Sequence, residues 1–505
     1  MEQYILAHDF GTSADKASLF NTEGKFIKTV TTAYPTNHSN STWAEQDPED
    51  WWRAFCNSTK TLLEGIEIQN VLCVAFDGTF PNCIPVDKAG KPTYPAIIWQ
   101  DMRAEKEANE LTDLIPTKYL TYGGEGIMRT EQSLPKLLWL KRNRPDVFQK
   151  TYKMLATPSD YIILRLTGNF VCEYAMANSM GTLDLENNIW SQASLEAAGI
   201  TEEMMPSLHD CTDIVGEVPS GALATECGLF PGTKLVIGTG DATCSSIGAG
   251  NINVGDACLT GGSSAGISAV VPAKEGEFGN GGRSYLPEGA RMMGGMTMAS
   301  GSAYGWVKNE LCKIEQKLAE ENGKSAYDYI NEEVASAPLG ANGVLFLPLL
   351  KGERSPFYNP KAKGSFLGIT LANTRSDLLR AVVEGIGFNI ALILEDIRKY
   401  GSIEKLTMVG GLAKSDVVRQ IFSDIMGVEL VTLKYMDEVA TVGAAIMGGI
   451  ALGIYKDYSD VKKFHAISAH NVPNMENHEK YKKILALYQK GYEAQVELFD
   501  AMAKL

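Results

Sequence analysis

Tyr4-Ile-Leu-Ala-His-Asp9-Phe-Gly-Thr-Ser13 is the stretch that best indicates how this chain folds. Its apolar residues before Asp9 predict a strand, the Gly-Thr-Ser turn ends that strand, and residues 17–20 predict a second one. Residues 21–24, Asn-Thr-Glu-Gly, are typical of a hairpin turn, and residues 26–32 predict a third strand. The chain therefore opens with a three-stranded meander whose first turn carries glycine and hydroxyl residues.

A similar layout returns near the middle of the chain. Residues 256–260 predict a strand, Gly-Gly-Ser-Ser at 261–264 predicts a turn, and residues 266–271 predict the next strand. The two copies share their layout and not their sequence, which indicates a duplicated architecture.

Helical patterns fill the spaces between these strands. Apolar residues recur at three- and four-residue spacing in 49–64, 135–143, 375–400, 414–426 and the C-terminal stretch from Tyr481 to Phe499. Strands and long helices in both halves together indicate an α/β fold built in layers.

The length of 505 residues exceeds what one hydrophobic core usually serves, so we expect two domains of roughly 200–250 residues each. We place the boundary near residue 246, which gives an N-terminal domain at 1–246 and a C-terminal domain at 247–505. No low-complexity linker marks this boundary. Its absence favours two lobes that pack on each other.

The composition excludes several classes of protein. The chain is 45% hydrophobic and 21% charged, as globular proteins are, and its formal net charge of -15 disfavours nucleic acid and anionic membranes as partners. None of the nine cysteines belongs to a C-x-x-C pair, which favours reduced thiols over a metal or disulfide framework. No segment is typical of a signal peptide or of a bilayer span. We therefore expect a cytoplasmic protein.

Asp9 and the turn after it are the first candidate site. A carboxylate at a strand end can hold Mg²⁺ through water. The turn can present donors to phosphate oxygens; its candidate residues are Gly11, Thr12, Ser13 and Lys16. The alternative is that Asp9 only forms the turn.

Two glycine-rich segments of the second half are candidates for the rest of a nucleotide site. The turn of the second meander could hold phosphate, and its alternative is a plain hairpin. The segment 409–415 predicts a strand, a glycine turn and a helix, where a flat ligand can lie against backbone; its alternative is a simple helix start. The residues concerned are Gly262, Ser263 and Ser264 in the first segment and Gly410, Gly411, Lys414 and Ser415 in the second.

Asp241 follows a predicted strand at 234–238 and precedes a helical stretch at 242–247. The commonest role of Asp at such a place is to cap the helix. The functional alternative is a carboxylate at the lip of a cleft that accepts the proton of an attacking hydroxyl. Phosphoryl transfer needs positioning, a metal, donors to phosphate and one base, so the two phosphate turns favour the base.

A short polar stretch after a predicted strand is the candidate sugar site. Its side chains combine a ring for stacking with groups that hydrogen-bond to hydroxyls. They are Trp99, Gln100, Asp101 and Arg103. The alternative is a surface Asp–Arg ion pair.

Taken together, these residues resemble the FGGY carbohydrate kinase family, which includes xylulose, glycerol and gluconate kinases. The likeness runs from Asp9 to about Ile454. Its most specific pieces are Trp43-Ala-Glu-Gln-Asp-Pro48 with Trp51-Trp52, Pro95 to Arg103, Lys136-Leu-Leu-Trp-Leu140, Gly238 to Gly250, Gly352-Glu-Arg-Ser-Pro356 and Gly364-Ser-Phe-Leu-Gly-Ile369 with Glu384-Gly385.

The resemblance implies an actin-like, ribonuclease H-like ATPase fold of two duplicated lobes that close a central cleft on Mg-ATP. It implies that Asp241 is the catalytic base and Asp9 the metal-associated acid. It assigns the turn at 11–13 and the turn at 262–264 to phosphate, the segment 410–415 to adenosine, and 99–103 to the sugar.

One segment departs from the family. Where xylulose kinases carry serine-glycine-glutamine-methionine-histidine for the sugar, this chain has Phe76-Asp77-Gly78-Thr79-Phe80-Pro81, and the arginine-glutamate pair of glycerol kinases is missing too. Asp77 would replace a polar contact, and Phe80 would make the pocket more apolar. A further difference is Glu173, where an aspartate is usual.

We therefore expect an ATP-dependent kinase that phosphorylates a hydroxyl of a small sugar or polyol. The segment Gly352–Pro356 favours a xylulose kinase-like substrate. The alternatives are another substrate, such as glycerol, gluconate or a different ketose or polyol, and a non-catalytic actin-like nucleotide switch. A homodimer is common in the family, although no residue of this sequence marks an interface.

Overall fold

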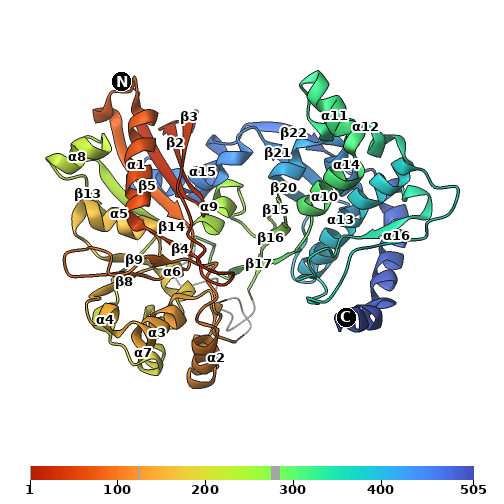
Figure 1. Ribbon diagram of the computed structural model, residues 1–505. Helices are drawn as coiled ribbons and strands as arrows, with labels where there is room; N and C mark the ends of the chain where they lie inside the picture. The colour runs from red at the N-terminus through yellow and green to blue at the C-terminus, as the bar shows by residue number, and fades with distance from the viewer. Residues whose placement is uncertain (1, 123–125, 274–284, 505) are drawn as a thin grey trace. The chain divides into compact units, whose positions relative to one another are not determined.

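The computed structural model describes residues 2–122, 126–273 and 285–504. The chain forms two compact units. The first comprises Met1–Gly248, Ala273–Gly289 and Glu438–Phe464, and the second comprises Ala249–Pro272, Ala290–Asp437 and His465–Leu505. The predicted boundary at residue 246 stays a prediction. The first unit also contains a segment from late in the chain, Glu438–Phe464 (Figure 1).

A six-stranded sheet forms the centre of the first unit. Its strand order is β13-β14-β5-β1-β2-β3, with β1 parallel to β5, β5 parallel to β14, and the other pairs antiparallel. The strands are β1 (Tyr4–Phe10), β2 (Ala14–Asn21), β3 (Phe26–Ala33), β5 (Val71–Gly78), β13 (Ile214–Glu217) and β14 (Lys234–Gly240).

The sheet of the second unit repeats this plan. Its order is β17-β16-β15-β20-β21-β22, again with a meander of three antiparallel strands followed by two parallel pairings and an antiparallel edge. The strands are β15 (Ala257–Gly261), β16 (Ala265–Pro272), β17 (Ala290–Met296), β20 (Lys405–Val409), β21 (Glu429–Leu433) and β22 (Ile467–Asn471). The predicted duplication is confirmed, and β17 completes the second meander beyond the strands predicted for it.

Strands β1, β5 and β14 are largely buried, because their side chains alternate between the two faces of the sheet and both faces are covered. One face carries Leu6, Phe10 and Phe76, which share a core with helix α1 (Pro48–Leu63). The other face meets α15 (Val439–Ala451), where a Cβ added to Gly448 would lie 3.0 Å from Cys73 Sγ. By the same alternation, Asp9 and Asp77 belong to the face that meets α15.

Small residues let α15 pack directly on α9 (Asp241–Gly248). A Cβ on Gly443 would lie 2.1 Å from the carbonyl oxygen of Cys244, and one on Gly248 would lie 1.8 Å from that of Val439. The glycines of this segment therefore serve the close approach of the two helices.

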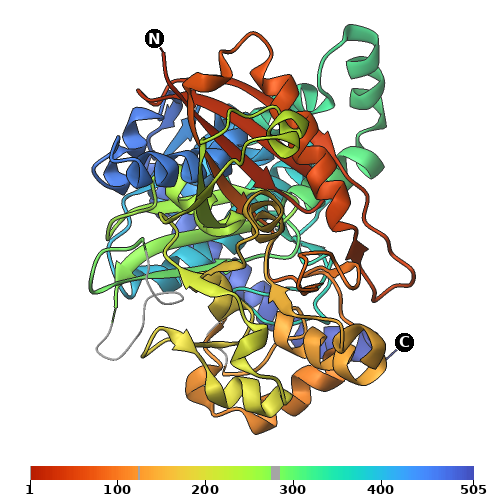
Figure 2. The same cartoon turned by 90° about the vertical axis from the view of Figure 1, so that its left-hand side faces the viewer.

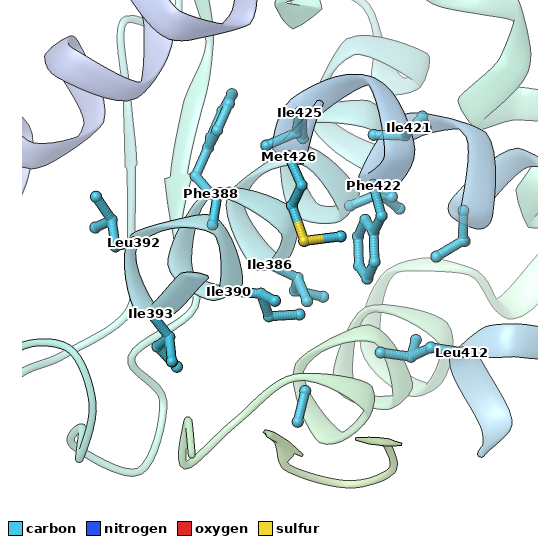
Figure 3. Packing of buried hydrophobic residues seen from close by; sticks show 14 of the residues in the cluster. Ile386, Phe388, Ile390, Leu392, Ile393, Leu412, Ile421, Phe422, Ile425 and Met426 are labelled. Atoms are coloured by element: carbon cyan, nitrogen blue, oxygen red, sulfur yellow. The ribbon is translucent and has the colours of Figure 1, made fainter. Parts of the chain in front are cut away.

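Helices α13 (Arg375–Arg398) and α14 (Asp416–Met426) form much of the core of the second unit. Figure 3 shows Phe388 and Ile386 of α13 beside Phe422 and Met426 of α14. The predicted helices at 49–64, 135–143 and 375–400 end within two residues of those observed. The helix predicted at 414–426 is observed only from Asp416 onward, because Ser415 is the N-cap of α14.

The remaining elements surround these sheets. Helices α2, α3, α4 and α7 gather beside one end of the first sheet, below it in both views (Figures 1 and 2). In the first unit the further elements are β4 (Glu45–Gln46), η1 (Ile68–Asn70), β6 (Ile84–Val86), β7 (Ala96–Ile97), α2 (Glu105–Leu114), η2 (Thr117–Tyr119), α3 (Ser133–Asn143), α4 (Pro145–Phe148), β8 (Lys153–Leu155), α5 (Pro158–Thr167), β9 (Val171–Glu173), α6 (Tyr174–Ser179), β10 (Leu183–Asp184), β11 (Ile189–Trp190), α7 (Gln192–Ala198), η4 (Glu202–Met204), β12 (Ser207–His209), α8 (Ala222–Cys227) and η8 (Tyr458–Lys463).

The further elements at the boundary and in the second unit are η7 (Met436–Glu438), α10 (Gly301–Leu311), α11 (Lys313–Asn322), α12 (Ala326–Ser336), η5 (Ala341–Gly343), β18 (Leu345–Leu347), β19 (Ser365–Leu367), η6 (Gly411–Lys414), α16 (Met475–Glu493) and α17 (Val496–Met502). Among the helices of the described residues, none has the length and apolar character needed to cross a membrane.

Candidate functional site

Three carboxylates gather at one edge of the first sheet. Asp9 lies in β1 and Asp77 lies opposite it in the parallel strand β5. Asp241 directly follows β14, the next parallel neighbour, in which Thr239 is the partner of Asp77. Parallel strands place their carboxyl ends on the same side, so residues far apart in the sequence meet there.

Asp9 and Asp77 form a buried carboxyl pair. Burial raises the pKa of Asp77 well above its usual range, and the neighbouring charges of Asp9 and Asp241 raise it further. Burial also raises the pKa of Asp9. The positive charge of Lys16, which lies opposite Asp9 on β2, opposes that rise. Two carboxylates at close range cannot both ionise easily, so each of them disfavours the charged form of the other.

Asp241 begins helix α9 immediately after an irregular strand. Gly238 has a φ of +66°, and a Cβ there would lie 1.7 Å from the carbonyl oxygen of Phe76, so only glycine fits this bulge. Oδ1 of Asp241 accepts from the N–H of Ala242 at 2.6 Å. Burial, followed by the charge of Asp9, raises the pKa of Asp241 to about 7. A carboxylate with this pKa is matched to proton transfer near neutral pH.

The turn after β1 is held by its neighbours. Gly11 N–H donates to the carbonyl of Ala14 at 2.9 Å, which closes the turn. Gln46 Nε2 donates to the carbonyl of Thr12 at 2.7 Å, and Ser13 is exposed. Lys16 follows on β2, opposite Asp9. Glycine, two hydroxyls and an ammonium are thus presented together on one short segment.

The acidic edge suits a hard divalent cation. Asp9 Oδ1 and both carboxylate oxygens of Asp77 are buried and have no hydrogen-bond partner within the described part of the chain. No three His, Cys, Asp or Glu side chains of residues 2–122, 126–273 and 285–504 are grouped as ligands of one metal. Mg²⁺ is commonly bound by one or two carboxylates together with water and substrate phosphates, and this set of oxygens fits that mode.

Trp99 is fixed at two points beside the turn at 11–13. Its indole N–H donates to Thr12 Oγ1 at 3.2 Å, and its backbone N–H donates to Asn82 Oδ1 at 3.1 Å. The side chain remains 38% exposed, and Gln100 beside it is exposed too. Trp99 and Gln100 can therefore contact a ligand that lies near Thr12.

Asp101 and Arg103 are placed differently, because both side chains are buried. Arg103 binds Asp101 at 2.7 Å and Glu45 at 2.8 Å, and its guanidinium lies 3.7 Å from the ring centre of Trp43. Asp101 also accepts from the N–H of Ala44 at 2.6 Å. These contacts give the pair a supporting role beneath Trp99, and direct contact with a sugar stays a prediction for them.

Phe80 lies against the backbone that leads to Asp241. A Cβ on Gly240 would lie 2.2 Å from the ring of Phe80 and 2.9 Å from Met176, so the ring covers this glycine. Phe80 is partly buried, whereas Asp77 is fully buried and faces Asp9. The segment 76–81, which departs from the family pattern, therefore places the ring of Phe80 near Asp241 and the carboxyl group of Asp77 next to Asp9.

In the second unit, the two predicted nucleotide segments lie side by side. A Cβ on Gly410 would lie 2.7 Å from the carbonyl oxygen of Gly261, next to the turn at 262–264. The start of α10 joins them, because Gly301 N–H donates to Gly262 at 3.0 Å and Ser302 N–H donates to Ser263 at 2.9 Å. Backbone from three glycine-rich turns thus meets at one place.

Lys414 and Ser415 have structural partners in the same unit. Ser415 Oγ accepts from the N–H of Val418 at 3.3 Å and caps α14. Lys414 Nζ lies 3.5 Å from Asp437 Oδ2, and both side chains are exposed. The helix start considered as the alternative for this segment is present, and a nucleotide contact of either side chain stays a prediction.

Sequence reasoning did not identify several groups at these places. Gln46, Asn82 and Gly301 hold the turns through backbone contacts, which leave no pattern in a sequence. Burial, then the charges of Glu131 and other groups including Asp241, raises the pKa of Tyr122 to about 12, so this phenol belongs to the same surroundings. A signal existed for Gln46 and Lys136, which both lie in the specific pieces of the family resemblance, and Lys136 is also a charged residue inside the apolar run from Leu134 to Leu140.

Asp77→Asn should remove a pH-dependent loss of stability. The raised pKa means that the folded state keeps a proton that the unfolded chain releases, so wild-type stability falls as pH rises above about 4. In thermal or urea unfolding without Mg²⁺, the variant should gain on the wild type as pH increases from 5 to 8, by at most about 1.4 kcal/mol per pH unit.

Asp184→Asn is the matched control, for which no pH dependence is expected in this range. Burial raises the pKa of Asp184, but hydrogen bonds that include one from Asn187 outweigh it and lower the pKa below its usual value, so the stability that Asp184 contributes changes only below about pH 4 and the curves of this variant and the wild type should stay parallel from pH 5 to 8. Parallel stability curves of Asp77→Asn and the wild type across this range would contradict the protonated acidic pair.

Comparison with known proteins agrees with this arrangement. The N-terminal domain model of the FGGY family of carbohydrate kinases matches residues 4–248, and the C-terminal domain model matches residues 251–452. Gluconokinase of Bacillus subtilis is 27% identical over 494 residues, which cover 97% of this chain and 95% of that protein. Xylulose kinase of Staphylococcus epidermidis is 30% identical over 507 residues, which cover 99% and 98%.

Solved structures agree as well. A ligand-bound xylulose kinase from Lactobacillus acidophilus superposes with a TM-score of 0.86 at 26% identity and covers 99% of this chain and 100% of that one. The predicted actin-like ATPase fold, the kinase class and the family are therefore confirmed. The chain belongs to the FGGY family of carbohydrate kinases, enzymes that transfer a phosphoryl group from ATP to a hydroxyl of a sugar.

Proposed function

We propose that this kinase phosphorylates a neutral ketose of the xylulose class and that Asp241 accepts the proton of the attacking hydroxyl. The observation that carries the proposal is the place of Asp241, at the end of β14 beside Asp9, with a pKa near 7. Family membership favours catalysis over the alternative of a nucleotide switch.

The residues at the sheet edge have separate tasks in this proposal. Asp241 takes the hydroxyl proton as the oxygen attacks the γ-phosphorus in line. Thr12, Ser13 and Lys16 donate to phosphate oxygens and neutralise part of their charge. Asp9 would hold Mg²⁺, which would supply further neutralisation of the phosphate charge when bound.

The second unit would bind the remainder of the nucleotide. The turn at 262–264 offers hydroxyls and backbone to phosphate, and Gly410 and Gly411 leave room for the adenosine to lie against backbone. Lys414 and Ser415 lie next to this surface. Lys414 already pairs with Asp437 and Ser415 already caps α14, which makes a direct role of either one secondary to that of the glycines.

A neutral acceptor suits the charges around Asp241. The acidic edge repels an anion such as gluconate, and the cations near it already have partners. Arg103 is bound by two carboxylates, and Arg129 lies 3.4 Å from Glu131. Trp99, Gln100 and Phe80 offer stacking surface and hydrogen bonds that suit a polyhydroxylated chain instead.

Asp241→Asn should lower kcat by roughly 10²–10⁴-fold, because the amide keeps the shape but cannot accept the proton. The dissociation constant of ATP should change little. Steady-state kinetics and calorimetric titration of ATP measure the two effects.

Asp47→Asn is the control for this substitution. Asp47 caps α1 through the N–H of Glu49 at 3.0 Å, and asparagine caps equally well, so activity should be kept. A turnover near that of the wild type in folded Asp241→Asn would remove the base from the proposal.

The pH dependence of kcat/KM for the sugar should follow the ionisation of Asp241. A base acts only when deprotonated, so the logarithm of kcat/KM should rise with a slope of about one below pH 7 and level off above it. A profile measured at saturating ATP that stays flat from pH 5.5 to 8 would contradict this assignment.

The acceptor should be identified by sugar-dependent ADP release. Xylulose and related ketopentoses are expected to give the highest kcat/KM, with gluconate and glycerol at least about tenfold lower, a difference of 1.4 kcal/mol in transition-state binding. Mixtures without sugar measure the background hydrolysis of ATP. A clear preference for gluconate would overturn the neutral acceptor while leaving the kinase class intact.

A further inference from the structure

Lys136 is a fully buried lysine near the start of α3. Its Nζ donates to the carbonyl of Ile98 at 2.8 Å and to the carbonyl of Glu131 at 2.7 Å. Both acceptors are backbone groups of irregular segments outside α3. One ammonium thus joins two pieces of chain that have no secondary structure to hold them.

The two joined segments both belong to the surroundings proposed for the sugar. Ile98 immediately precedes Trp99, whose indole reaches Thr12. Glu131 pairs with Arg129, and its charge acts on Tyr122, a neighbour of Asp241. The distance between the Trp99 segment and the 129–131 segment therefore depends on Lys136.

Asn82 extends the same arrangement to the segment that departs from the family pattern. Its Nδ2 donates to the carbonyls of Thr79 at 2.8 Å and Ala156 at 3.2 Å, and its Oδ1 accepts from the N–H of Trp99. Ser133 Oγ, also on α3, donates to the carbonyl of Asn82 at 2.6 Å. Helix α3 therefore holds all three sugar-side segments by hydrogen bonds to backbone.

Burying the ammonium group of Lys136 costs free energy. A buried ammonium loses its hydration, and burial lowers the pKa of Lys136 to about 7, against the attraction of Cys83, Asp101 and Glu131. An apolar side chain of similar length would fill this buried position without this cost. Such a cost is typical of residues kept for positioning rather than for stability.

We propose that Lys136 is a positioning residue of the acceptor site, which fixes the Trp99 segment against the 129–131 segment. The proposal rests on the proposed place of the sugar beside Trp99. It does not depend on which sugar is the acceptor.

The test is Lys136→Met, which keeps the length of the side chain and removes its donors. A misplacement of reacting groups by about 1 Å can cost about 10²-fold in rate, so kcat/KM for the sugar should fall roughly 10–100-fold. KM for ATP should stay within about twofold of the wild-type value, because Gln46 holds the turn at Thr12 independently of the Trp99 segment. Hydrogen exchange should quicken at backbone amides of 97–103 and 129–133.

Lys141→Met is the matched control on the same helix. Lys141 also donates to backbone carbonyls, those of Ala198 at 3.3 Å and of Gly199, but these lie at the end of α7. Its loss should quicken exchange near residue 199 and leave kcat/KM for the sugar unchanged. An equal loss of activity in both variants would show a general effect of destabilisation and overturn the inference, as would unchanged kinetics in folded Lys136→Met.

Ser133→Ala serves if Lys136→Met does not fold. It removes one hydroxyl from the same tether, and a rise of about threefold in sugar KM with unchanged ATP KM supports the inference, whereas no change overturns it.

Trp99→Ala separates this inference from the proposed function. If Trp99→Ala leaves sugar KM unchanged, the proposed place of the sugar fails; if it raises sugar KM and Lys136→Met does not, only the role of Lys136 fails.

Discussion

The parallel pairing of β1, β5 and β14 is the constraint on which the site depends. It brings Asp9, Asp77 and Asp241 to one sheet edge although they are far apart in the chain. Their burial opposes ionisation, so the edge is a place where the fold gives up stability. The apolar faces on both sides of the same strands offset that loss, because β1 and β5 are buried against α1 and α15.

The roles of Asp241 as a helix start and as a base do not exclude each other. The carboxylate begins α9 and accepts one backbone N–H, which orients it. The bulge at Gly238 sets the direction in which the chain leaves the strand, and Phe80 covers Gly240 on the other side. The helix start and the proposed base therefore use the same backbone geometry, so the two alternatives that the sequence left open for Asp241 are compatible.

The sequence was informative where a structure depends on neighbours in the chain. Alternating apolar residues and turn residues predicted the first meander and two strands of the second, and glycine-hydroxyl turns predicted where phosphate could bind. The contacts of Lys136 with Ile98, 38 residues away, and of Asn82 with Trp99, 17 residues away, could not be predicted. Their partners are backbone groups, which every residue carries. The burial of Arg103 likewise depends on Trp43 and Trp139, which only the tertiary fold brings to it.

This kind of tether has a consequence for specificity. Lys136, Ser133 and Asn82 hold carbonyl oxygens, so the side chains on the held segments are free to change without loosening the segments. A family can then keep one fold and one phosphoryl-transfer site while it changes acceptors through a few side chains. In this chain Phe80 and Pro81 stand in place of a polar segment, and Asn82 still fixes the backbone there. In the proposed acceptor site, the choice of acceptor would therefore be set by side chains such as Trp99, Gln100 and Phe80, and their geometry by the buried residues that hold their backbone.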